Sequence, residues 1–162
     1  MKLPLRIVRD TREQLNCGWM FAEGFDPQPI VTVAKLETGD YSLVGHEQDV
    51  VVERKTLQDL VGCLGIGRDR FEREMHRMKG IGAAIVIVES PQSLLRRGKY
   101  RGKLLPESAW QSVVSFTCRY RVPFAFCRNA REAERLCFDF LRHYANGFVK
   151  KMRAIQKAEG AS

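Results

Sequence analysis

The sequence is short of the features that mark secreted, zinc-binding or membrane-spanning proteins. Its five cysteines include no Cys-x-x-Cys pair, and its three histidines lie far apart in the chain. These spacings argue against a disulfide framework or a zinc site and favour a reducing compartment. No apolar run approaches the roughly 20 residues that cross a bilayer, and the N-terminal residues lack the apolar core of a signal peptide. We therefore expect no membrane association.

Acidic residues are also in the minority. The chain of 162 residues has 27 Lys and Arg against 19 Asp and Glu, a formal net charge of +8, and arginine outnumbers lysine by 18 to 9. Such a surplus favours an anionic partner, which is nucleic acid, an acidic membrane surface or an acidic protein. Because the planar guanidinium binds phosphate at two points, the arginine excess favours nucleic acid.

The hydrophobic pattern predicts short strands first and then strands that alternate with helices. Strands are predicted at residues 5–9, 30–34, 41–44, 49–55, 83–89 and 122–126. Helices are predicted at residues 56–64, 70–79, 106–120 and 130–144. This order predicts an α/β domain of three layers, with a central mixed sheet flanked by helices. The most apolar strand, 83–89, is expected at the centre of the sheet.

Polar and glycine-containing segments set the boundaries of these elements. Thr56 and Asp59 form a capping-box pattern at the start of the first helix. Residues 65–67, Gly-Ile-Gly, follow a helix rather than a strand, so we expect a helix–helix turn there and no phosphate-binding loop. Residues 45–48 are expected to connect a hairpin, and Asn129 is expected to cap the last helix.

Acidic side chains gather where the predicted strands begin or end. Asp10 and Glu13 follow the first strand, Asp40 precedes the third, and Glu53 ends the fourth. Because residues two apart on a strand point to the same side, Glu53 and Lys55 are expected to face one cleft. Carboxylate and carbonyl oxygens are hard ligands that suit Mg²⁺ or Mn²⁺. Such a cation could polarise a phosphate and activate a water beside the lysine. The alternative is a solvated ion pair between Glu53 and Lys55.

Further residues appear in the order that is found in one nuclease family. They are Asp10-x-Arg12-Glu13, Gly39-Asp40-Tyr41, Glu53-Arg54-Lys55-x-x-x-Asp59, Arg70-Phe71 and an apolar strand that ends at Glu89, followed by residues 108–110, 119–124 and 128–134. This order resembles the nuclease domain of the XPF/Hef-type family of structure-specific endonucleases, whose hallmark is an ERK-x-x-x-D motif after a GD turn. The resemblance covers about residues 5–146.

The resemblance implies a restriction-endonuclease-like fold and a DNA endonuclease. Such an enzyme would hydrolyse phosphodiesters in branched, flapped or junction DNA, which includes Holliday junctions and flaps formed in repair, recombination and replication. Mg²⁺ would be the cofactor, with Mn²⁺ able to substitute. Hydrolysis would use a metal-activated water without a covalent intermediate.

The resemblance also assigns roles to the motif residues. Asp40 and Glu53 match the principal metal ligands, and Lys55 matches the catalytic lysine. Asp10 and Glu13 match acidic positions near a second metal, so Asp10 joins the expected metal ligands. Whether one or two metals bind stays open.

The remaining motif residues are expected to support this centre. Arg54 and Asp59 complete the catalytic motif, and Asp59 is expected to orient its neighbours from the helix start. Arg12 and Arg70 are expected to contact phosphate or to brace the acidic cluster. One departure is Glu74, which stands where the family commonly has glutamine.

A second departure concerns domain organisation. The family usually carries tandem helix-hairpin-helix modules, for which no room remains after Asn146. We therefore expect a nuclease domain at residues 1–146 and a basic C-terminal tail, helical or frayed, at residues 147–162. The protein's own basic surface, or a partner protein, would then bind the DNA in place of these modules. A stand-alone domain favours an enzyme that is cytoplasmic or nucleoid-associated in a bacterial or phage-infected cell.

A basic loop and the last helices are further candidates for contacts. The loop contains Arg96, Arg97, Lys99, Tyr100, Arg101 and Lys103 and no acidic residue. It is predicted to contact DNA, with Tyr100 stacking on a base, and the alternative is a solvated surface loop. A homodimer could form through Val113, Phe116, Leu136 and Phe140, which could equally be core residues.

Two other functions compete with a structure-specific endonuclease. One is a sequence-specific, restriction-type nuclease on the same fold. The other is a non-catalytic DNA-binding subunit, because the resembled family includes inactive partners. The intact set of Asp40, Glu53 and Lys55 argues against the second alternative, since a degenerate partner should lose these residues first.

Overall fold

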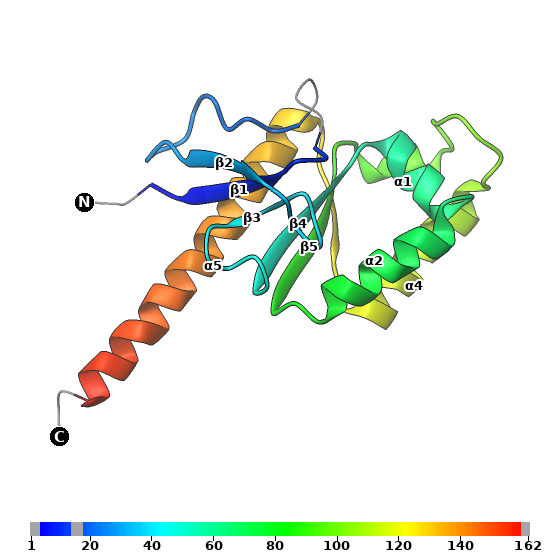
Figure 1. Ribbon diagram of the computed structural model, residues 1–162. Helices are drawn as coiled ribbons and strands as arrows, with labels where there is room; N and C mark the ends of the chain where they lie inside the picture. The colour runs from blue at the N-terminus through cyan, green and yellow to red at the C-terminus, as the bar shows by residue number, and fades with distance from the viewer. Residues whose placement is uncertain (1–3, 14–17, 160–162) are drawn as a thin grey trace.

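A computed structural model describes residues 4–13 and 18–159 as one six-stranded mixed sheet with helices on both faces (Figure 1). The strands are β1 (Arg6–Asp10), β2 (Ile30–Ala34), β3 (Tyr41–Leu43), β4 (Val50–Lys55), β5 (Ala83–Val88) and β6 (Phe124–Phe126). The helices are α1 (Leu57–Leu64), α2 (Arg68–Lys79), α3 (Gln92–Arg96), α4 (Pro106–Tyr120) and α5 (Ala130–Glu159). The predicted α/β class with a mixed central sheet is confirmed.

The strands lie in the order β2-β1-β3-β4-β5-β6. Strand β3 is antiparallel to both of its neighbours, β1 and β4, whereas β4, β5 and β6 run parallel. The expectation that strand 83–89 lies at the centre is wrong, because β5 is one strand in from the edge. Its strongly apolar sequence reflects cover on both faces of the sheet, which a parallel strand needs wherever it lies.

Alternating side chains of β4 and β5 belong to two separate hydrophobic cores. Val51, Val86 and Val88 pack in the core that α1, α2 and α4 cover. Val50 and Val52 point the other way, into the core beneath α5 and the segment before β2. Because successive strand residues face opposite sides, both faces of these strands must be apolar. The first helices and α5 accordingly lie on opposite sides of the sheet in Figure 1.

The connections predicted from glycine and capping residues are confirmed. Thr56 and Asp59 form the capping box of α1, and residues 65–67 make the turn from α1 into α2. The Asn129 side chain accepts a hydrogen bond from the Glu132 N–H at the start of α5, at 3.0 Å. The short helix α3 was not predicted from the sequence.

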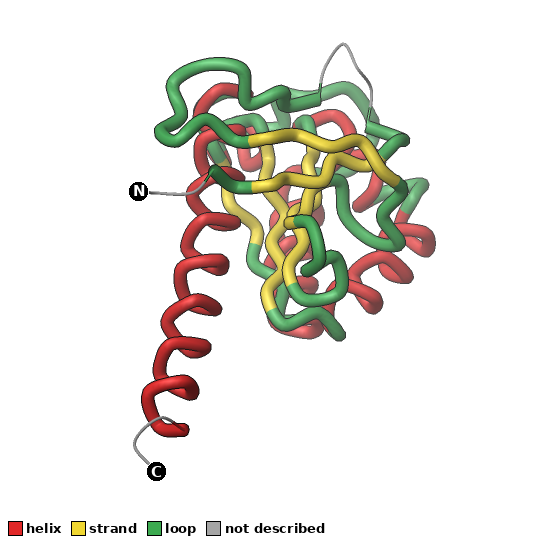
Figure 2. The backbone as a smooth tube through the Cα atoms, turned by 60° about the vertical axis from the view of Figure 1, so that its left-hand side comes forward, coloured by secondary structure: helices red, strands yellow, loops and turns green. Residues whose placement is uncertain are grey.

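Helix α5 continues past Tyr144, where the predicted helix ends, as far as Glu159. Figure 2 shows its C-terminal half running beyond the sheet. The continuation is rich in helix-forming Lys, Ala, Met and Gln, and one glycine at position 147 costs only about 1 kcal/mol of helix propensity.

Within the described segments, no helix has both the length and the apolar character needed to cross a membrane.

Candidate active site

A glycine turn places Asp40 against the C-terminal end of β4. Gly39 has a φ of +80°, and an added Cβ would lie 3.0 Å from Val51 Cβ and 3.2 Å from the Val52 carbonyl oxygen. Only glycine combines this backbone conformation with so close an approach. The Asp40 N–H then donates to the Val52 carbonyl at 2.8 Å. The Gly-Asp pair therefore fixes Asp40 beside the residues that follow Val52.

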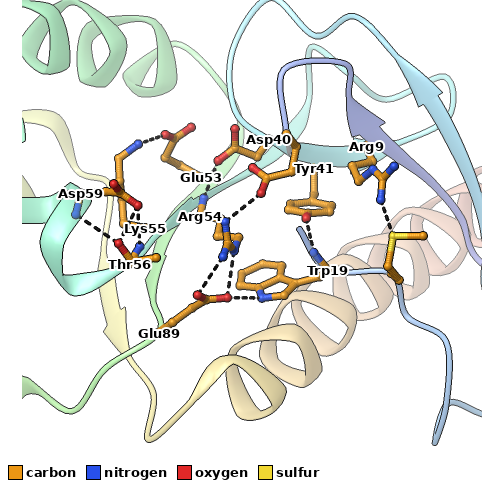
Figure 3. Close-up of polar contacts among 12 residues, drawn as sticks. Arg9, Trp19, Asp40, Tyr41, Glu53, Arg54, Lys55, Thr56, Asp59 and Glu89 are labelled. Carbon is orange, nitrogen blue, oxygen red and sulfur yellow. Dashed lines mark hydrogen bonds and ion pairs between the residues drawn. The ribbon is translucent and has the colours of Figure 1, made fainter. Parts of the chain in front are cut away.

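Strand alternation separates the three residues of the motif into two sides. Glu53 and Lys55 lie on one side and form an ion pair through Glu53 Oε1. Arg54 points to the other side, where its guanidinium contacts Glu89 (Figure 3). The prediction from strand periodicity that Glu53 and Lys55 face one side together is confirmed.

Glu53 carries an oxygen that the fold leaves without a partner. The residue is 3% exposed, and its Oε2 atom is buried with no hydrogen-bond donor in the described part of the chain. Asp40 lies next to it and accepts a hydrogen bond from the Arg54 N–H through Oδ2 at 2.8 Å. Lys55 completes the group, with its Nζ atom 5.4 Å from the centre of the Phe71 ring. We call Asp40, Glu53 and Lys55 the carboxylate–lysine centre.

Burial makes these carboxylates reluctant to carry charge without a cation. Burial raises the pKa of Asp40 to about 7, with the charges of Glu13 and Glu74 adding to the effect. Burial also raises the pKa of Glu53 well above its usual value, and the charge of Asp40 adds to it. For Lys55, burial lowers the pKa, but the charges of Glu53 and Glu74 outweigh burial and raise it. Lys55 therefore stays an ammonium at neutral pH.

The donor set of this centre fits a hard divalent cation. Two carboxylates, one of them with an unpartnered buried oxygen, are ligands that Mg²⁺ and Mn²⁺ prefer. Among residues 4–13 and 18–159, no three His, Cys, Asp or Glu side chains lie close enough together to hold an ion. A cation at Asp40 and Glu53 would therefore need water, backbone or substrate oxygens to complete its coordination.

Arg54 joins three elements through a buried ionic cluster. Its guanidinium donates to Glu13 at 2.8 Å and to Glu89 at 2.8 and 2.9 Å, and all three side chains are 8% exposed. Trp19 donates its indole N–H to Glu89 as well, at 2.5 Å. Burial raises the pKa of Glu13 despite Arg54. The structure thus places Glu13 with Arg54, on the opposite side of β4 from Glu53.

Asp10 is also engaged by its neighbours. Its carboxylate accepts hydrogen bonds from the Arg12 side chain at 2.6 and 3.2 Å and from the Leu36 N–H at 2.6 Å. Burial alone would raise the pKa of Asp10, but these hydrogen bonds outweigh it and lower the pKa. The Asp10 N–H donates to the Asp40 carbonyl at 2.8 Å. The structure therefore brings Asp10 beside the centre through its backbone and turns its carboxylate toward Arg12.

The other two predicted motif residues lie at helix starts. Asp59 Oδ2 accepts from the Thr56 hydroxyl at 2.6 Å, which matches the expectation that Asp59 orients its neighbours. Arg70 is exposed in the first turn of α2.

The basic loop begins within α3 and is attached to α1 beside the motif. Gln58 donates to the Arg101 carbonyl at 2.8 Å and accepts from the Arg101 N–H at 3.0 Å. Tyr100 is half-buried, and its hydroxyl donates to the Leu104 carbonyl at 2.9 Å. The guanidinium of Arg96 lies 5.2 Å from the Trp110 ring centre. Exposed side chains in the loop are Arg96, Arg97, Lys99, Arg101 and Lys103.

The four apolar residues considered for a dimer face all contact the hydrophobic cores. Val113 and Phe116 are buried in the core beneath α1, α2 and α4. Leu136 and Phe140 pack against the core beneath α5. The core alternative therefore accounts for Val113 and Phe116, whereas Leu136 and Phe140 are only partly buried.

Sequence reasoning did not select Glu89, Trp19 or Gln58 as site residues, although each contacts one. Glu89 directly follows a buried strand, which is the same signal that selected Glu53. Trp19 and Gln58 carry no such signal, because the contacts of Trp19 with Glu89 and of Gln58 with Arg101 join segments that meet only in the folded chain. Glu74 was noticed only as a substitution in the family pattern, yet its charge acts on Asp40, Glu53 and Lys55.

Comparisons with known proteins identify the family and the fold of this chain. The profile of the ERCC4 domain family matches residues 9–140. The fold is similar to XPF from Aeropyrum pernix at a TM-score of 0.68, with 21% identity over 93% of this chain and 70% of that one. A structure of XPF from Aeropyrum pernix in complex with DNA also matches at 0.68, with 23% identity over 88% of this chain and 66% of that one. The search of curated proteins gave no match.

The family match covers most of the chain and includes every residue of the carboxylate–lysine centre. The structural likeness independently shows the same fold, a mixed sheet flanked by helices. The chain therefore belongs to the ERCC4 domain family, the XPF-type nuclease domains, which are generally metal-dependent endonucleases.

Proposed function

We propose that this protein is a Mg²⁺-dependent endonuclease that hydrolyses phosphodiesters in branched, flapped or junction DNA. The observation that carries the proposal is the buried, unpartnered Oε2 atom of Glu53 beside Asp40 and Lys55. A buried carboxylate oxygen without a donor is costly unless a cation or a proton satisfies it. In a family of generally metal-dependent nucleases, a divalent cation is the natural partner.

Each residue of the centre has a role that follows from its position. Asp40 and Glu53 would hold the cation, and the Arg54 N–H fixes the orientation of the Asp40 carboxylate. When bound, Mg²⁺ polarises a phosphate oxygen and lowers the pKa of a water. Lys55 stays protonated, so it acts as a hydrogen-bond donor that orients water or neutralises charge on the phosphate, not as a general base.

Two further groups of residues support the centre in this proposal. The Arg54–Glu13–Glu89 cluster fixes the end of β4 and so the direction in which Glu53 and Lys55 point. Asp10, held by Arg12, supports the Asp40 turn through its backbone. We do not assign a second cation to Asp10 or Glu13, because both carboxylates already accept hydrogen bonds from arginines.

The basic loop supplies the DNA contact in this proposal. Its two hydrogen bonds to Gln58 attach Arg101 to the first turn of α1, which begins two residues after Lys55. Exposed Lys99, Arg101 and Lys103 can contact phosphates there without specifying sequence. The half-buried Tyr100 with its engaged hydroxyl is better suited to shape the loop than to stack on a base. The similar XPF structure in complex with DNA supports DNA as the ligand.

A panel of labelled DNAs tests the proposal. Wild-type protein and Lys55→Ala are incubated with flaps, forks, four-way junctions and linear duplex, in Mg²⁺ and in EDTA. We expect cutting near branch points by the wild type in Mg²⁺ only, and DNA binding without cutting by K55A. Glu47→Gln, in the β3–β4 hairpin, is the control and should cut like the wild type.

The same panel separates the alternatives. Cutting of linear duplex at fixed sequences would favour a restriction-type nuclease. Binding without cutting by the wild type in Mg²⁺ and in Mn²⁺ would favour a non-catalytic subunit. Equal cutting by the wild type and K55A would contradict the assigned role of Lys55.

A further inference from the structure

One face of helix α2 lies over the carboxylate–lysine centre. At one end of this face, the Phe71 ring lies 5.4 Å from Lys55 Nζ. At the other, Arg77 Nε donates at 3.1 Å to the hydroxyl of Thr38, which is two residues before Asp40. Positions three apart on a helix are neighbours on its surface. Glu74 is three residues from both Phe71 and Arg77, so it lies between them on the face of α2 that approaches Lys55 and Thr38.

Glu74 differs from the other acidic residue in the middle of α2. Glu72 forms ion pairs with Arg68 at 3.1 Å and Arg119 at 3.7 Å. Glu74 is half-buried and forms no ion pair within residues 4–13 and 18–159. Its charge acts on Lys55 and Arg12 without forming an ion pair with either, so its carboxylate oxygens stay available to water molecules at the site.

We propose that Glu74 is a positioning residue for the divalent cation, which it binds through the cation's water molecules. This inference rests on the proposed function, because it assumes a cation at Asp40 and Glu53. Three carboxylates and one ammonium leave two negative charges at the site when all are ionised, which a divalent cation neutralises. Glutamine at this position could hydrogen-bond to water but would supply no charge.

Contact through water fits the geometry better than direct ligation. In the described residues, no three acidic, histidine or cysteine side chains come close enough to hold an ion directly. Mg²⁺ gives up its water reluctantly and usually keeps several water molecules in protein sites. A carboxylate that accepts hydrogen bonds from those waters also limits where the cation can lie.

Mn²⁺ binding in the absence of DNA tests this proposal without using activity. Wild type, Glu74→Gln, Glu72→Gln and Glu53→Gln are titrated with Mn²⁺ by calorimetry, and the melting temperature of each metal-free protein checks its fold. Loss of a group that supports a metal site through other atoms typically weakens binding about 10–100-fold. We expect E74Q to raise the Kd about 10-fold and E72Q to leave it unchanged. We expect E53Q to lose most of the binding.

The four proteins distinguish failure of this inference from failure of the proposed function. Wild-type affinity in E74Q together with loss in E53Q would overturn the role of Glu74 and leave the cation site intact. Wild-type affinity in E53Q would remove the cation site and with it the proposed function. Equal weakening in E72Q and E74Q would also overturn the inference, because it would show a general effect of charge on α2. If E74Q melts at a lower temperature, Glu74→Asp, which keeps the charge, should bind Mn²⁺ more tightly than E74Q; equal affinities would count against the proposal.

Discussion

At the scale of single residues, acidic side chains in similar sequence settings have different partners. Asp10 and Glu13 follow a strand much as Glu53 ends one, yet arginines engage the first two and Glu53 keeps an unpartnered oxygen. The alternation of β4 predicts that Glu53 and Lys55 share a side. It cannot predict which arginine reaches which acid, because that depends on loops that meet only in the fold.

The raised pKa of Asp40 predicts a pH-dependent stability for the metal-free protein. Its pKa rises from 3.8 to about 7 on folding, chiefly through burial. A raised folded-state pKa means that stability is fully present below pH 3.8 and is lost as the pH rises through about 7. Asp40→Asn removes this charge. In EDTA at pH 8 we expect the variant to melt about 2–4 °C higher than the wild type.

Melting measured at pH 8 and at pH 4.5 checks the sign of this effect. The difference between D40N and wild type should shrink at pH 4.5, where Asp40 is protonated in the folded state. Asp69→Asn, which changes an exposed carboxylate on α2, should give no gain at pH 8. A D40N variant that is less stable than wild type at pH 8 would contradict the burial of an ionisable Asp40.

Arg54 is predicted to contribute to stability as well as to the site. Arg54→Ala leaves Glu13 and Glu89 buried without their cation, both being 8% exposed. Removing one partner of a buried ionic cluster costs about 3–5 kcal/mol of unfolding free energy. Chemical denaturation measures this loss. Arg97→Ala, on the exposed basic loop, is the control and should change stability by less than about 0.5 kcal/mol. A similar small loss in R54A would show that the cluster is not formed in solution.

At the scale of elements, sequence patterns predict strands and helices well and their extents less well. Strand 30–34 and helix 106–120 have the predicted bounds, because apolar periodicity and a proline at the helix start define them. The last helix was predicted to end at about Tyr144, with a tail after Gly147 that is either helical or frayed; the structure continues it as one helix to Glu159, since glycine inside a helix is only mildly unfavourable. The position of β5 was missed because an apolar strand reports burial of its faces, not its place in the sheet.

Helix α5 yields a prediction at Gly147. A Cβ added there would meet nothing within 4 Å, so Gly147→Ala should stabilise the helix by about 0.5–1 kcal/mol. Hydrogen exchange of amides 148–152 should slow about 2–5-fold. Gly24→Ala also has open space but a φ of +82°, so it should destabilise the protein. Unchanged exchange after G147A would indicate that α5 ends before Gly147 in solution.

The basic loop predicts how DNA-binding affinity depends on salt concentration. Replacing Lys99, Arg101 and Lys103 together by alanine should weaken DNA binding and flatten its dependence on salt. Each phosphate that the variant no longer neutralises makes the slope of log K against log salt concentration shallower by about 0.9. Fluorescence anisotropy of labelled flap DNA measures the slope. Arg6→Ala, at the opposite end of β1 from Asp10, is the control. An unchanged slope in the triple variant would place the DNA elsewhere.

At the scale of the whole molecule, the fold brings together groups that are widely separated in the chain. Asp40 comes from the turn before β3, Glu53 and Lys55 from the end of β4, and Glu74 from α2. The motif order identified the family from sequence, and the profile match confirms it. The position of Glu74 over the centre could not be predicted, because it depends on how α2 packs through Phe71 and Arg77.

The most direct test of the central claim is a single-turnover cleavage measurement with Glu53→Gln. Wild type and variant are bound to labelled flap DNA in EDTA at saturating protein, and excess Mg²⁺ starts the reaction. We predict rapid product formation by the wild type and a rate at least about 100-fold lower for E53Q, with similar DNA affinity. Product formation by E53Q at the wild-type rate would contradict a cation site built on this buried carboxylate.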